Sequence, residues 1–365
     1  MPASGPGPDR PDPRIRFVEA CGGNDINSKK QGCTNMKRTL LSFLAVAAMS
    51  ASALAADIKP AIIYDLGGKF DKSFNEAAFN GAEKFKAETG IAYRDFEIAN
   101  DSQREQALRR FAKDGNNPIV MAGFSWAAAL EKIATEYPDT KFAIIDMVVD
   151  KPNVRSVVFK EQEGSYLVGV LAALASKTGT VSFVGGMDIP LIRKFACGYK
   201  GGVMATKPDA KVLEAMTGTT PDAWNDPVKG GEITKSQIDQ GSDVIYAAAG
   251  GTGIGVLQAA ADAGKLGIGV DSNQNGIQPG KVLTSMLKRV DVAVYNAFMD
   301  AKNDAFTPGF NSLGLAEDGV DYAMDEHNAS LVTDDMKKAV EAAKADIIAG
   351  KIEVHDYMSD EKCPY

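Results

Sequence analysis

The chain has 365 residues, of which 45% are hydrophobic and 24% are charged, and this is the composition of an ordinary globular protein. The formal net charge at pH 7 is −8, and no run rich in Lys or Arg interrupts the body of the chain, so a nucleic-acid partner is not expected. The length predicts roughly two domains.

The first 55 residues are expected to lie outside the fold. Residues 1–35 are rich in Pro and Gly and lack periodicity, and we interpret them as a non-native upstream extension. Residues 36–55 have the pattern of a signal peptide: Lys37-Arg38, an apolar stretch too short to span a bilayer, and a small-residue cleavage site ending at Ala55. No Cys stands at this junction, so we expect a periplasmic protein without a lipid anchor. The alternative is an N-terminal extension followed by a buried helix.

Apolar runs alternate with helical stretches through the rest of the chain. The first series predicts strands at 61–66, 91–98, 118–124, 141–147 and 154–159, with helices at 73–88, 102–113 and 126–137. The second predicts strands at 180–185, 211–216, 243–249, 267–271, 282–288 and 320–324, with helices at 162–176, 191–205, 228–240, 291–303 and 333–349 and one more between the strands at 243–249 and 267–271. Ser73 and Glu76 have the spacing of a capping box.

This alternation predicts an α/β protein with two doubly wound parallel-sheet lobes that close about a hinge. We place the N-terminal lobe at residues 57–159 plus about 275–310, and the C-terminal lobe at 160–274 plus about 311–365. The late elements are too few for a third domain, so they are expected to rejoin the two lobes.

One strand–helix–strand unit carries the clearest ligand-binding pattern. An apolar run ends at Gly250-Gly251, a helix of small residues follows, and a second apolar run ends at Asp271. So long a crossover predicts a parallel strand pair, and open parallel sheets bind ligands just beyond the carboxyl ends of their strands. The glycines do not match the dinucleotide fingerprint, because Val256 stands where the third glycine belongs. An exported NAD-type oxidoreductase is the alternative from another functional class.

Motifs for catalysis are missing from the sequence. The two histidines, His327 and His355, lie away from the glycine loops, and no nucleophile elbow, zinc motif or phosphate loop is present. We therefore expect a protein that is not an enzyme and holds no metal or cofactor. Cys197 and Cys363 can pair in an oxidising compartment, but the sequence does not show that they meet.

Acidic, glycine and aromatic residues recur where predicted strands end and helices begin. The candidate ligand-binding residues are Asp65, Phe74, Asn75, Phe124, Asp146, Phe195, Trp224, Asp226, Gly251, Asp271 and Lys288. Carboxylates accept hydrogen bonds from vicinal hydroxyls and aromatic faces clamp a flat ring, so this set predicts a neutral ligand with a sugar end and a planar end. Simpler roles stay open, since Phe74 and Phe195 also suit a helix core, and Asp65 and Asp226 also suit a helix N-cap.

Five ordered segments carry a family resemblance: Asp71–Asn75, Glu163–Gly169, Ala249–Gly253, Val270–Gln274 and Thr284–Arg289. In these segments the chain resembles the basic membrane protein family of ABC-transporter substrate-binding proteins, whose best-understood members are purine nucleoside receptors. The resemblance implies a type I periplasmic-binding fold with the ligand between the lobes. It also implies an ABC permease in the inner membrane as the partner, and we expect a monomer.

The resemblance further implies roles for single residues in binding a purine nucleoside. Phe74 would stack on the base and Asn75 would hydrogen-bond it, with Phe195 as the opposite aromatic ring and Asp146 as the acid that contacts the base. Contacts to the ribose would fall to Asp226, Gly251, Asp271 and Lys288. The chain departs from the family at Trp224, where a smaller aromatic residue is usual. A receptor for a free purine base, a sugar or a vitamin-like ring is the alternative.

Overall fold

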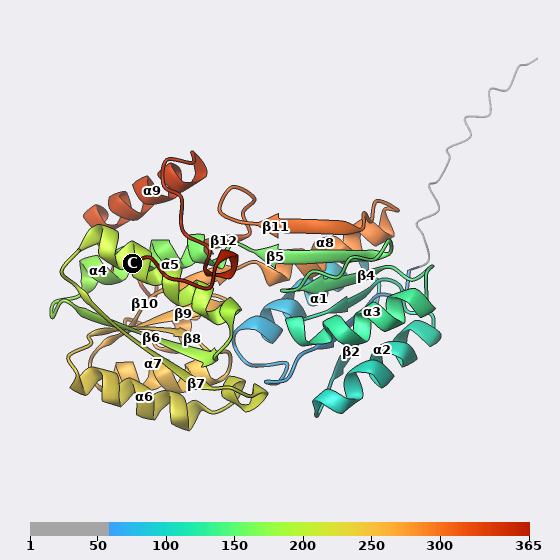
Figure 1. The fold of residues 1–365 in the computed structure, drawn as a ribbon, viewed down its shortest axis with the longest axis horizontal. Coiled ribbons are helices and arrows are strands. Elements are labelled where there is room, and N and C mark those ends of the chain that lie inside the picture. The colour runs from blue at the N-terminus through green and yellow to red at the C-terminus, as the bar shows by residue number, and fades with distance from the viewer. Residues whose placement is uncertain (1–57) are drawn as a thin grey trace, which may run out of the picture. The chain divides into compact units, whose positions relative to one another are not determined.

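Two lobes, each built on a six-stranded sheet, make up residues 58–365, which are the part of the chain that the computed structural model describes (Figure 1). The predicted extension and signal peptide, residues 1–35 and 36–55, lie outside the described residues. The first sheet has the strand order β11-β5-β4-β3-β1-β2, and every pair in it is parallel. Its strands are β1 (Ala61–Tyr64), β2 (Arg94–Glu97), β3 (Ile119–Met121), β4 (Phe142–Ile145), β5 (Val154–Phe159) and β11 (Gly309–Leu313).

The second sheet repeats this plan with the order β12-β10-β9-β8-β6-β7, in which only β12 runs antiparallel to its neighbour. Its strands are β6 (Thr180–Met187), β7 (Lys211–Gly218), β8 (Val244–Ala248), β9 (Leu266–Asp271), β10 (Val282–Lys288) and β12 (Val320–Tyr322). The strand order reverses at β1 in the first sheet and at β6 in the second, and ligands bind beside such switch points. The predicted α/β class with two doubly wound sheets is confirmed.

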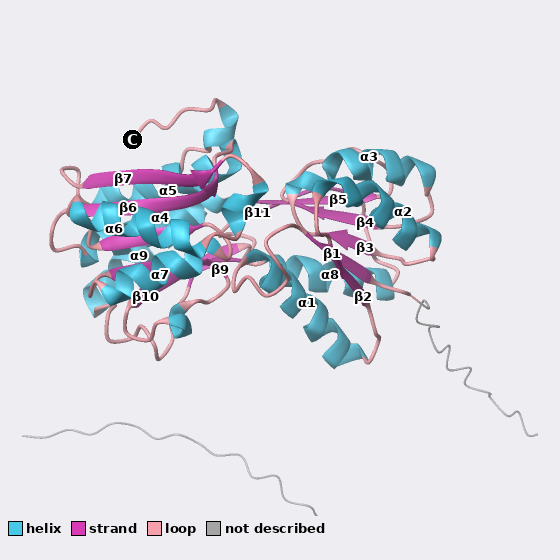
Figure 2. Cartoon of the chain, turned by 90° about the horizontal axis from the view of Figure 1, so that it is seen from below, coloured by secondary structure: helices cyan, strands magenta, loops and turns pink. Residues whose placement is uncertain are grey.

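Helices cover both faces of each sheet, as Figure 2 shows for the first lobe and Figure 1 for the second. The α-helices are α1 (Phe74–Thr89), α2 (Arg104–Lys113), α3 (Ala127–Glu136), α4 (Glu161–Ala175), α5 (Pro190–Thr206), α6 (Pro227–Asp239), α7 (Thr252–Asp262), α8 (Val290–Lys302) and α9 (Asp334–Ile348). Short 3-10 helices are η1 (Asp101–Gln103), η2 (Phe124–Trp126), η3 (Pro221–Trp224), η4 (Asn275–Ile277) and η5 (Tyr357–Ser359). Within residues 58–365, no helix has the length and apolar character to cross a membrane.

The central strands of both sheets are buried on both faces, as the continuous apolar runs in the sequence predict. In β1, Ile62 and Tyr64 pack with α1 and α8, while Ala61 and Ile63 pack with α2 and α3. In the second lobe, α4 and α5 pack together on one face and α6 and α7 on the other. Strand positions, and therefore the loops that follow the strands, are fixed by two hydrophobic layers rather than one.

The chain passes between the lobes after β5, after β10 and after β11. The crossing segments are tied to each other, because Lys160 N donates to Leu313 O at 2.9 Å and Arg289 N donates to Gly319 O at 2.9 Å. After the second crossing, α8 packs against α1 so closely that a Cβ added to Gly81 would lie 2.1 Å from the carbonyl oxygen of Asp291. Residues 290–313 thus complete the first lobe.

The predicted boundary between the lobes is wrong for β10. The sequence predicts that residues 275–310 belong to the N-terminal lobe, but β10 lies within this segment, pairs with β9 and belongs to the second sheet. β11 was not predicted as a strand, and it pairs with β5 in the first sheet. Its sequence, Gly309-Phe310-Asn311-Ser312-Leu313, is largely exposed and lacks the buried alternation on which strand prediction depends.

A disulfide joins Cys197 on α5 to Cys363 near the C-terminus, across a sequence separation of 166 residues. Cys197 is buried beneath the C-terminal segment, and the ring of Tyr365 covers Gly201 on the same helix. The pairing that the sequence left open is therefore present. It anchors the last residues of the chain to the helix that also carries Phe195.

Candidate functional site

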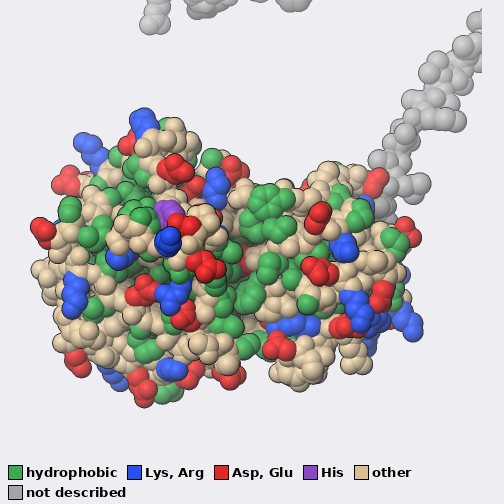
Figure 3. All heavy atoms as spheres, in the orientation of Figure 1, with side chains coloured by type: hydrophobic (Ala, Val, Ile, Leu, Met, Phe, Trp, Pro, Cys, Tyr) green, Lys and Arg blue, Asp and Glu red, His purple; other side chains and the backbone are tan. Residues whose placement is uncertain are grey.

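A cavity lies between the two lobes, at the carboxyl ends of the strands. It encloses about 620 Å³ including the part open to solvent, which is in the usual range for a small-molecule site. In Figure 3, hydrophobic side chains gather along the boundary between the lobes, whereas charged side chains are scattered over the outer surface. The lining residues are Asp65, Leu66, Asp71, Phe74, Asn75, Gly123, Phe124, Asp146, Leu191, Ile192, Phe195, Trp224, Ala248, Gly250, Val270, Asp271 and Lys288.

Aromatic rings reach the cavity from both lobes. Phe74 is the first residue of α1 in the first lobe, and Phe195 lies on α5 in the second. The ammonium of Lys288 lies 5.2 Å from the ring centroid of Phe74, 5.2 Å from that of Phe159 and 5.6 Å from that of Phe195. One cation thus marks the place where rings of both lobes converge.

Lys288 is also the centre of a buried ion network. Its Nζ lies 2.7 Å from Asp146 Oδ2 and 2.9 Å from Glu161 Oε1, and the Lys288 side chain is only 2% exposed. Lys194 Nζ lies 2.6 Å from the other oxygen of Glu161 and donates to the carbonyl of Phe159 at 2.9 Å. The network therefore connects the end of β4, the first crossing segment, α5 and the end of β10.

Burial and the neighbouring charges set the protonation of this network. Burial raises the pKa of Asp146 to about 6, and Lys288 works against that rise. Burial also acts to raise the pKa of Glu161, but Lys194 and Lys288 outweigh it, so the pKa of that carboxyl is lowered. Burial acts to lower the pKa of Lys288, and Asp146 and Glu161 more than reverse this, so the ammonium is retained.

Asp271 and Asp146 end strands β9 and β4 and share an uncommon backbone conformation. Their φ angles are 65° and 69°, in the left-handed region that non-glycine residues seldom adopt. Asp271 accepts a short hydrogen bond from Ser73 Oγ of the other lobe, and burial raises its pKa. Close by, Ser272 Oγ donates to Ser73 O at 3.0 Å and Gln274 Nε2 donates to Lys72 O at 2.9 Å. The lobes are thus hydrogen-bonded to each other at the cavity.

The start of α1 is capped by a residue that the sequence analysis did not choose. The predicted capping box is wrong, since the Ser73 side chain makes no bond to the helix backbone. The carboxylate of Asp71 instead accepts from the backbone N–H groups of Ser73, Asn75 and Glu76, at 2.8, 3.0 and 3.1 Å. Ser73 is left to contact Asp271 because Asp71 has taken over the cap.

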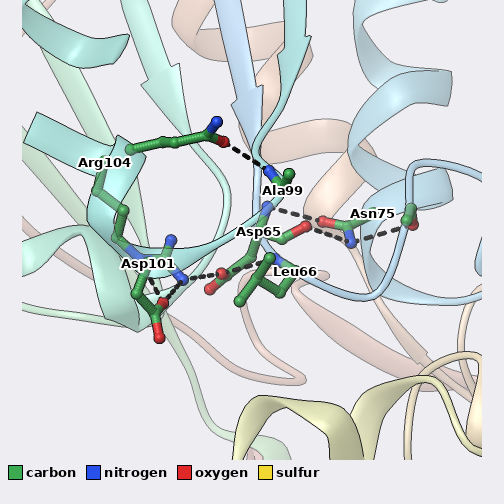
Figure 4. A network of polar contacts seen from close by, with 8 residues as sticks. Asp65, Leu66, Asn75, Ala99, Asp101 and Arg104 are labelled. Carbon is green, nitrogen blue, oxygen red and sulfur yellow. Dashed lines mark hydrogen bonds and ion pairs between the residues drawn. The ribbon is translucent and has the colours of Figure 1, made fainter. Parts of the chain in front are cut away.

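Asn75 holds the loop that carries Asp65. Its Nδ2 donates to Asp65 O and Gly68 O, each at 3.2 Å, and its Oδ1 accepts from Asp65 N at 3.3 Å. Figure 4 shows these contacts together with those of the Asp65 carboxylate, which accepts from Leu66 N and Arg104. Asp65 is not a helix cap, and both amide hydrogens of Asn75 are bound within the protein.

Trp224, at the end of η3, covers the carboxyl end of β6. A Cβ on Gly186 would lie 2.2 Å from the indole ring, so only glycine admits the tryptophan at this position. The carbonyl of Trp224 lies over Gly250 and Gly251, the glycine pair after β8. Trp224 is thereby fixed by contacts with two strand ends of the second sheet.

All the predicted site residues except Asp226 and Gly251 line this cavity. Asp226 is the N-cap of α6, where its side chain accepts from Lys229 N at 2.9 Å. Gly251 is buried behind Gly250, between the Trp224 carbonyl and the Asp71 side chain. The N-cap role that was left open for Asp226 is therefore the one the structure has.

Several residues of the site escaped the sequence analysis. Asp71 is the first residue of the segment Asp71–Asn75, and Lys194 directly precedes Phe195. Glu161 and Arg104 lie in no recognised motif. No sequence signal was available for Lys194, because α5 also carries Arg193 and Lys200 and no local pattern shows which of the three is buried. No group of His, Cys, Asp and Glu in residues 58–365 is arranged to hold a metal ion.

Comparisons with known proteins agree with one another. The family model described as "ABC transporter substrate-binding protein PnrA-like" (Bmp) matches residues 59–357. The chain is 32% identical over 357 residues to the "ABC transporter nucleoside-binding protein BmpA" of Lactococcus lactis subsp. cremoris, covering 87% of this chain and 99% of that protein. It is 37% identical over 281 residues to an uncharacterized lipoprotein of Pyrococcus horikoshii, covering 73% and 68%. A solved ABC transporter solute-binding protein from Aeropyrum pernix K1 matches with a TM-score of 0.76 and 30% identity, over 82% of this chain and 93% of that one.

Proposed function

Since this chain belongs to the PnrA-like (Bmp) family of ABC transporter substrate-binding proteins, we propose that it captures a purine nucleoside between its lobes and delivers it to the permease of its transporter. Substrate-binding proteins of ABC transporters bind a small-molecule ligand and a permease. The family is one of binding proteins and not of enzymes. The predicted type I periplasmic-binding fold is confirmed by the two sheets and by the solved solute-binding proteins that the chain resembles. The identity of the ligand is the part that we propose.

The observation that carries the proposal is the pairing of aromatic rings and carboxylates in one interlobe cavity. Phe74 and Phe195 come from different lobes and approach the same Lys288 ammonium, so closure of the lobes brings two rings toward a shared space. Asp146 and Asp271 line that space and offer acceptor oxygens. A flat base between the rings and hydroxyl groups against the carboxylates would use both features.

The charge of the lining supports a neutral ligand. Asp65, Asp71, Asp146 and Asp271 line the cavity, and Lys288 is the basic residue that lines it with them. An anionic ligand would add a further negative charge to a partly buried site in which burial, and to a lesser extent neighbouring carboxylates, already raises the pKa values of Asp71 and Asp146. A nucleoside is neutral, whereas a nucleoside monophosphate carries the unfavourable charge.

Calorimetric titration of the full chain, unfolded and refolded to remove any bound ligand, tests this function. The panel is adenosine, guanosine, inosine, cytidine, adenine, ribose and adenosine monophosphate. We expect saturable binding of at least one purine nucleoside, and weak or absent binding of cytidine, ribose and the monophosphate. Binding of adenine or ribose alone would replace the nucleoside with a free base or a sugar as the ligand.

Phe74→Ala and Asp271→Ala are each expected to weaken nucleoside binding at least tenfold, which corresponds to about 1.4 kcal/mol or more. The first variant removes a stacking surface. The second removes an acceptor and its hydrogen bond to Ser73 across the lobes. Calorimetry with the best nucleoside of the panel measures both effects.

Phe70→Ala is the matched control for the aromatic variant. Phe70 lies on the loop before α1, is 62% exposed and does not line the cavity, so its loss should leave the affinity unchanged. Unchanged affinity in both Phe74→Ala and Asp271→Ala would show that the nucleoside binds somewhere else.

We also propose that residues 36–55 direct export to the periplasm and that the mature protein begins at Ala56 without a lipid anchor. The charged, apolar and small-residue regions of this segment support export. The lack of a Cys at the cleavage site supports a free protein, in contrast to the relatives that are named lipoproteins. N-terminal sequencing and mass measurement of the protein recovered from cells would refute this if they found a lipid-modified residue.

A further inference from the structure

The Asp65 carboxylate is held in a fixed orientation at the wall of the cavity. Its Oδ1 accepts from Leu66 N at 2.8 Å and from Arg104 Nη2 at 2.6 Å (Figure 4). Its Oδ2 lies beside Gly123, where an added Cβ would come within 2.3 Å. Gly123 itself lines the cavity and has a φ of 108°, so the carboxylate rests on a backbone that only glycine readily provides.

Arg104, the first residue of α2, is itself fixed on several sides. Its Nε and Nη2 donate to Asp101 Oδ1 at 3.0 and 2.7 Å, and its guanidinium carbon lies 4.9 Å from the ring of the fully buried Trp126. Only 6% of the residue is exposed, and its Nη1 is buried without a hydrogen-bond partner among the residues that the structure describes.

This burial of Arg104 is costly and needs a compensating contact. A buried charge is tolerated only when it is paired, and an unpaired donor on it adds to the cost. Asp101 lies mostly in solvent, with 61% of its side chain exposed, so pairing with Asp101 would not by itself require a buried arginine. The contact that does require it is the one with Asp65.

Arg104 also opposes the effect of burial on the Asp65 carboxyl. Burial raises the pKa of Asp65, and the charge and hydrogen bond of Arg104 act to lower it. The backbone of Asp65 is held separately by Asn75, so the loop position does not depend on the arginine. Loss of Arg104 would therefore free the side chain of Asp65 and favour its protonated form while the loop stays in place.

We propose that Arg104 is a positioning residue for ligand recognition: its ion pair orients the Asp65 side chain, so that the first lobe presents a hydrogen-bond acceptor to the ligand. The ligand must then place an N–H or O–H donor against this wall of the cavity. This inference rests on the proposed function, because it concerns the selectivity of the same site. Arg104 acts through Asp65 and does not itself line the cavity.

The test compares Arg104→Met with Arg109→Met in the full chain. Arg109 lies on the same helix and pairs with Glu136 at 2.8 Å on the surface, away from Asp65, so it is a matched control. With the nucleoside that binds the unaltered chain best, we expect Arg104→Met to weaken binding about tenfold or more, and Arg109→Met to stay within about twofold.

A double-mutant cycle shows whether the arginine acts through the carboxylate. In an Asp65→Asn background, Arg104→Met should cost less than about twofold, because the group it positions is already gone. An equal loss in both backgrounds would overturn the proposal, since a purely structural arginine gives additive effects. Should Arg104→Met fail to fold, Arg104→Lys keeps a charge near Asp65 without the planar fork, and affinity equal to that of the unaltered chain would likewise overturn it.

The pH dependence gives a second readout that a structural role would not change. The charged groups near Asp65 are Arg104 and Asp101, and the other charged groups of the cavity, Asp71, Asp146, Asp271 and Lys288, are present in both proteins. Between about pH 7.5 and about pH 5.5, affinity should fall further in Arg104→Met than in the unaltered chain, because Asp65 takes up its proton at higher pH. Equal pH profiles would contradict the proposal.

The failure of the proposed function and the failure of this inference give different results. If the unaltered chain binds no nucleoside, the proposed function is overturned, and the inference with it. If the unaltered chain binds a nucleoside and Arg104→Met binds it equally well, only the inference is overturned.

Discussion

Replacement of Lys288 with Met is expected to lower the free energy of unfolding by about 3–5 kcal/mol, because it leaves Asp146 and Glu161 buried without the ammonium that they share. Without the cation, the pKa of Asp146, which burial already raises, moves further above that of the unfolded chain, and the pKa of Glu161 rises from its lowered value. The folded variant then binds more protons than the unfolded one, so its stability should increase as the pH falls. Part of the loss seen at neutral pH should therefore be recovered in mild acid.

Urea unfolding at several pH values measures this effect, and Lys281→Met provides the control. Lys281 is exposed just before the same strand and makes no ion pair among the described residues, so its replacement should change stability very little. Equal stabilities for Lys288→Met and Lys281→Met would mean that the buried network contributes nothing to the fold.

The second large effect is expected from the disulfide. Replacing Cys197 and Cys363 together with Ala should lower the free energy of unfolding by roughly 2–4 kcal/mol, because the bond closes a loop of 166 residues and restricts the unfolded chain. Ala suits the buried position of Cys197, where an added polar group would be costly. Thermal or urea unfolding of the oxidised chain and the double variant gives the difference.

Reductant serves as the control for this prediction. The unaltered chain should lose a similar amount of stability when it is fully reduced, and the double variant should not respond to reductant at all. A variant as stable as the oxidised chain would show that the bond does not restrict the unfolded state to any useful extent.

Much of the fold could be predicted from local sequence because the central strands of both sheets are buried on two faces. Buried parallel strands such as β4 and β8 are continuous apolar runs, and the helices between them carry one apolar face, so their order along the chain determines the α/β class. β11 gave no such signal, since it is exposed and is ordered by pairing with β5. The position of β10 in the second sheet likewise depends on its partner β9, which is not a local property.

The candidate site was predictable where strand ends alone determine position. Asp65, Asp146 and Asp271 follow buried strands, and the topology brings the carboxyl ends of those strands to one cavity. The partners of two of these acids could not be predicted, because Arg104 reaches Asp65 from helix α2 and Ser73 reaches Asp271 from the other lobe. The pair Gly250-Gly251 likewise does not show in the sequence which of the two glycines lines the cavity, and in the structure it is Gly250.

The return of residues 290–313 to the first lobe determines when that lobe can fold during synthesis. A nascent chain that ends before residue 290 contains β1 to β5 but lacks α8 and β11, so the apolar face of α1 is uncovered and β5 is an open edge. The second lobe must likewise wait for β12 and α9. Because compact units fold as wholes, neither lobe can finish while the other is still being translated, and both should be completed together near the end of the chain.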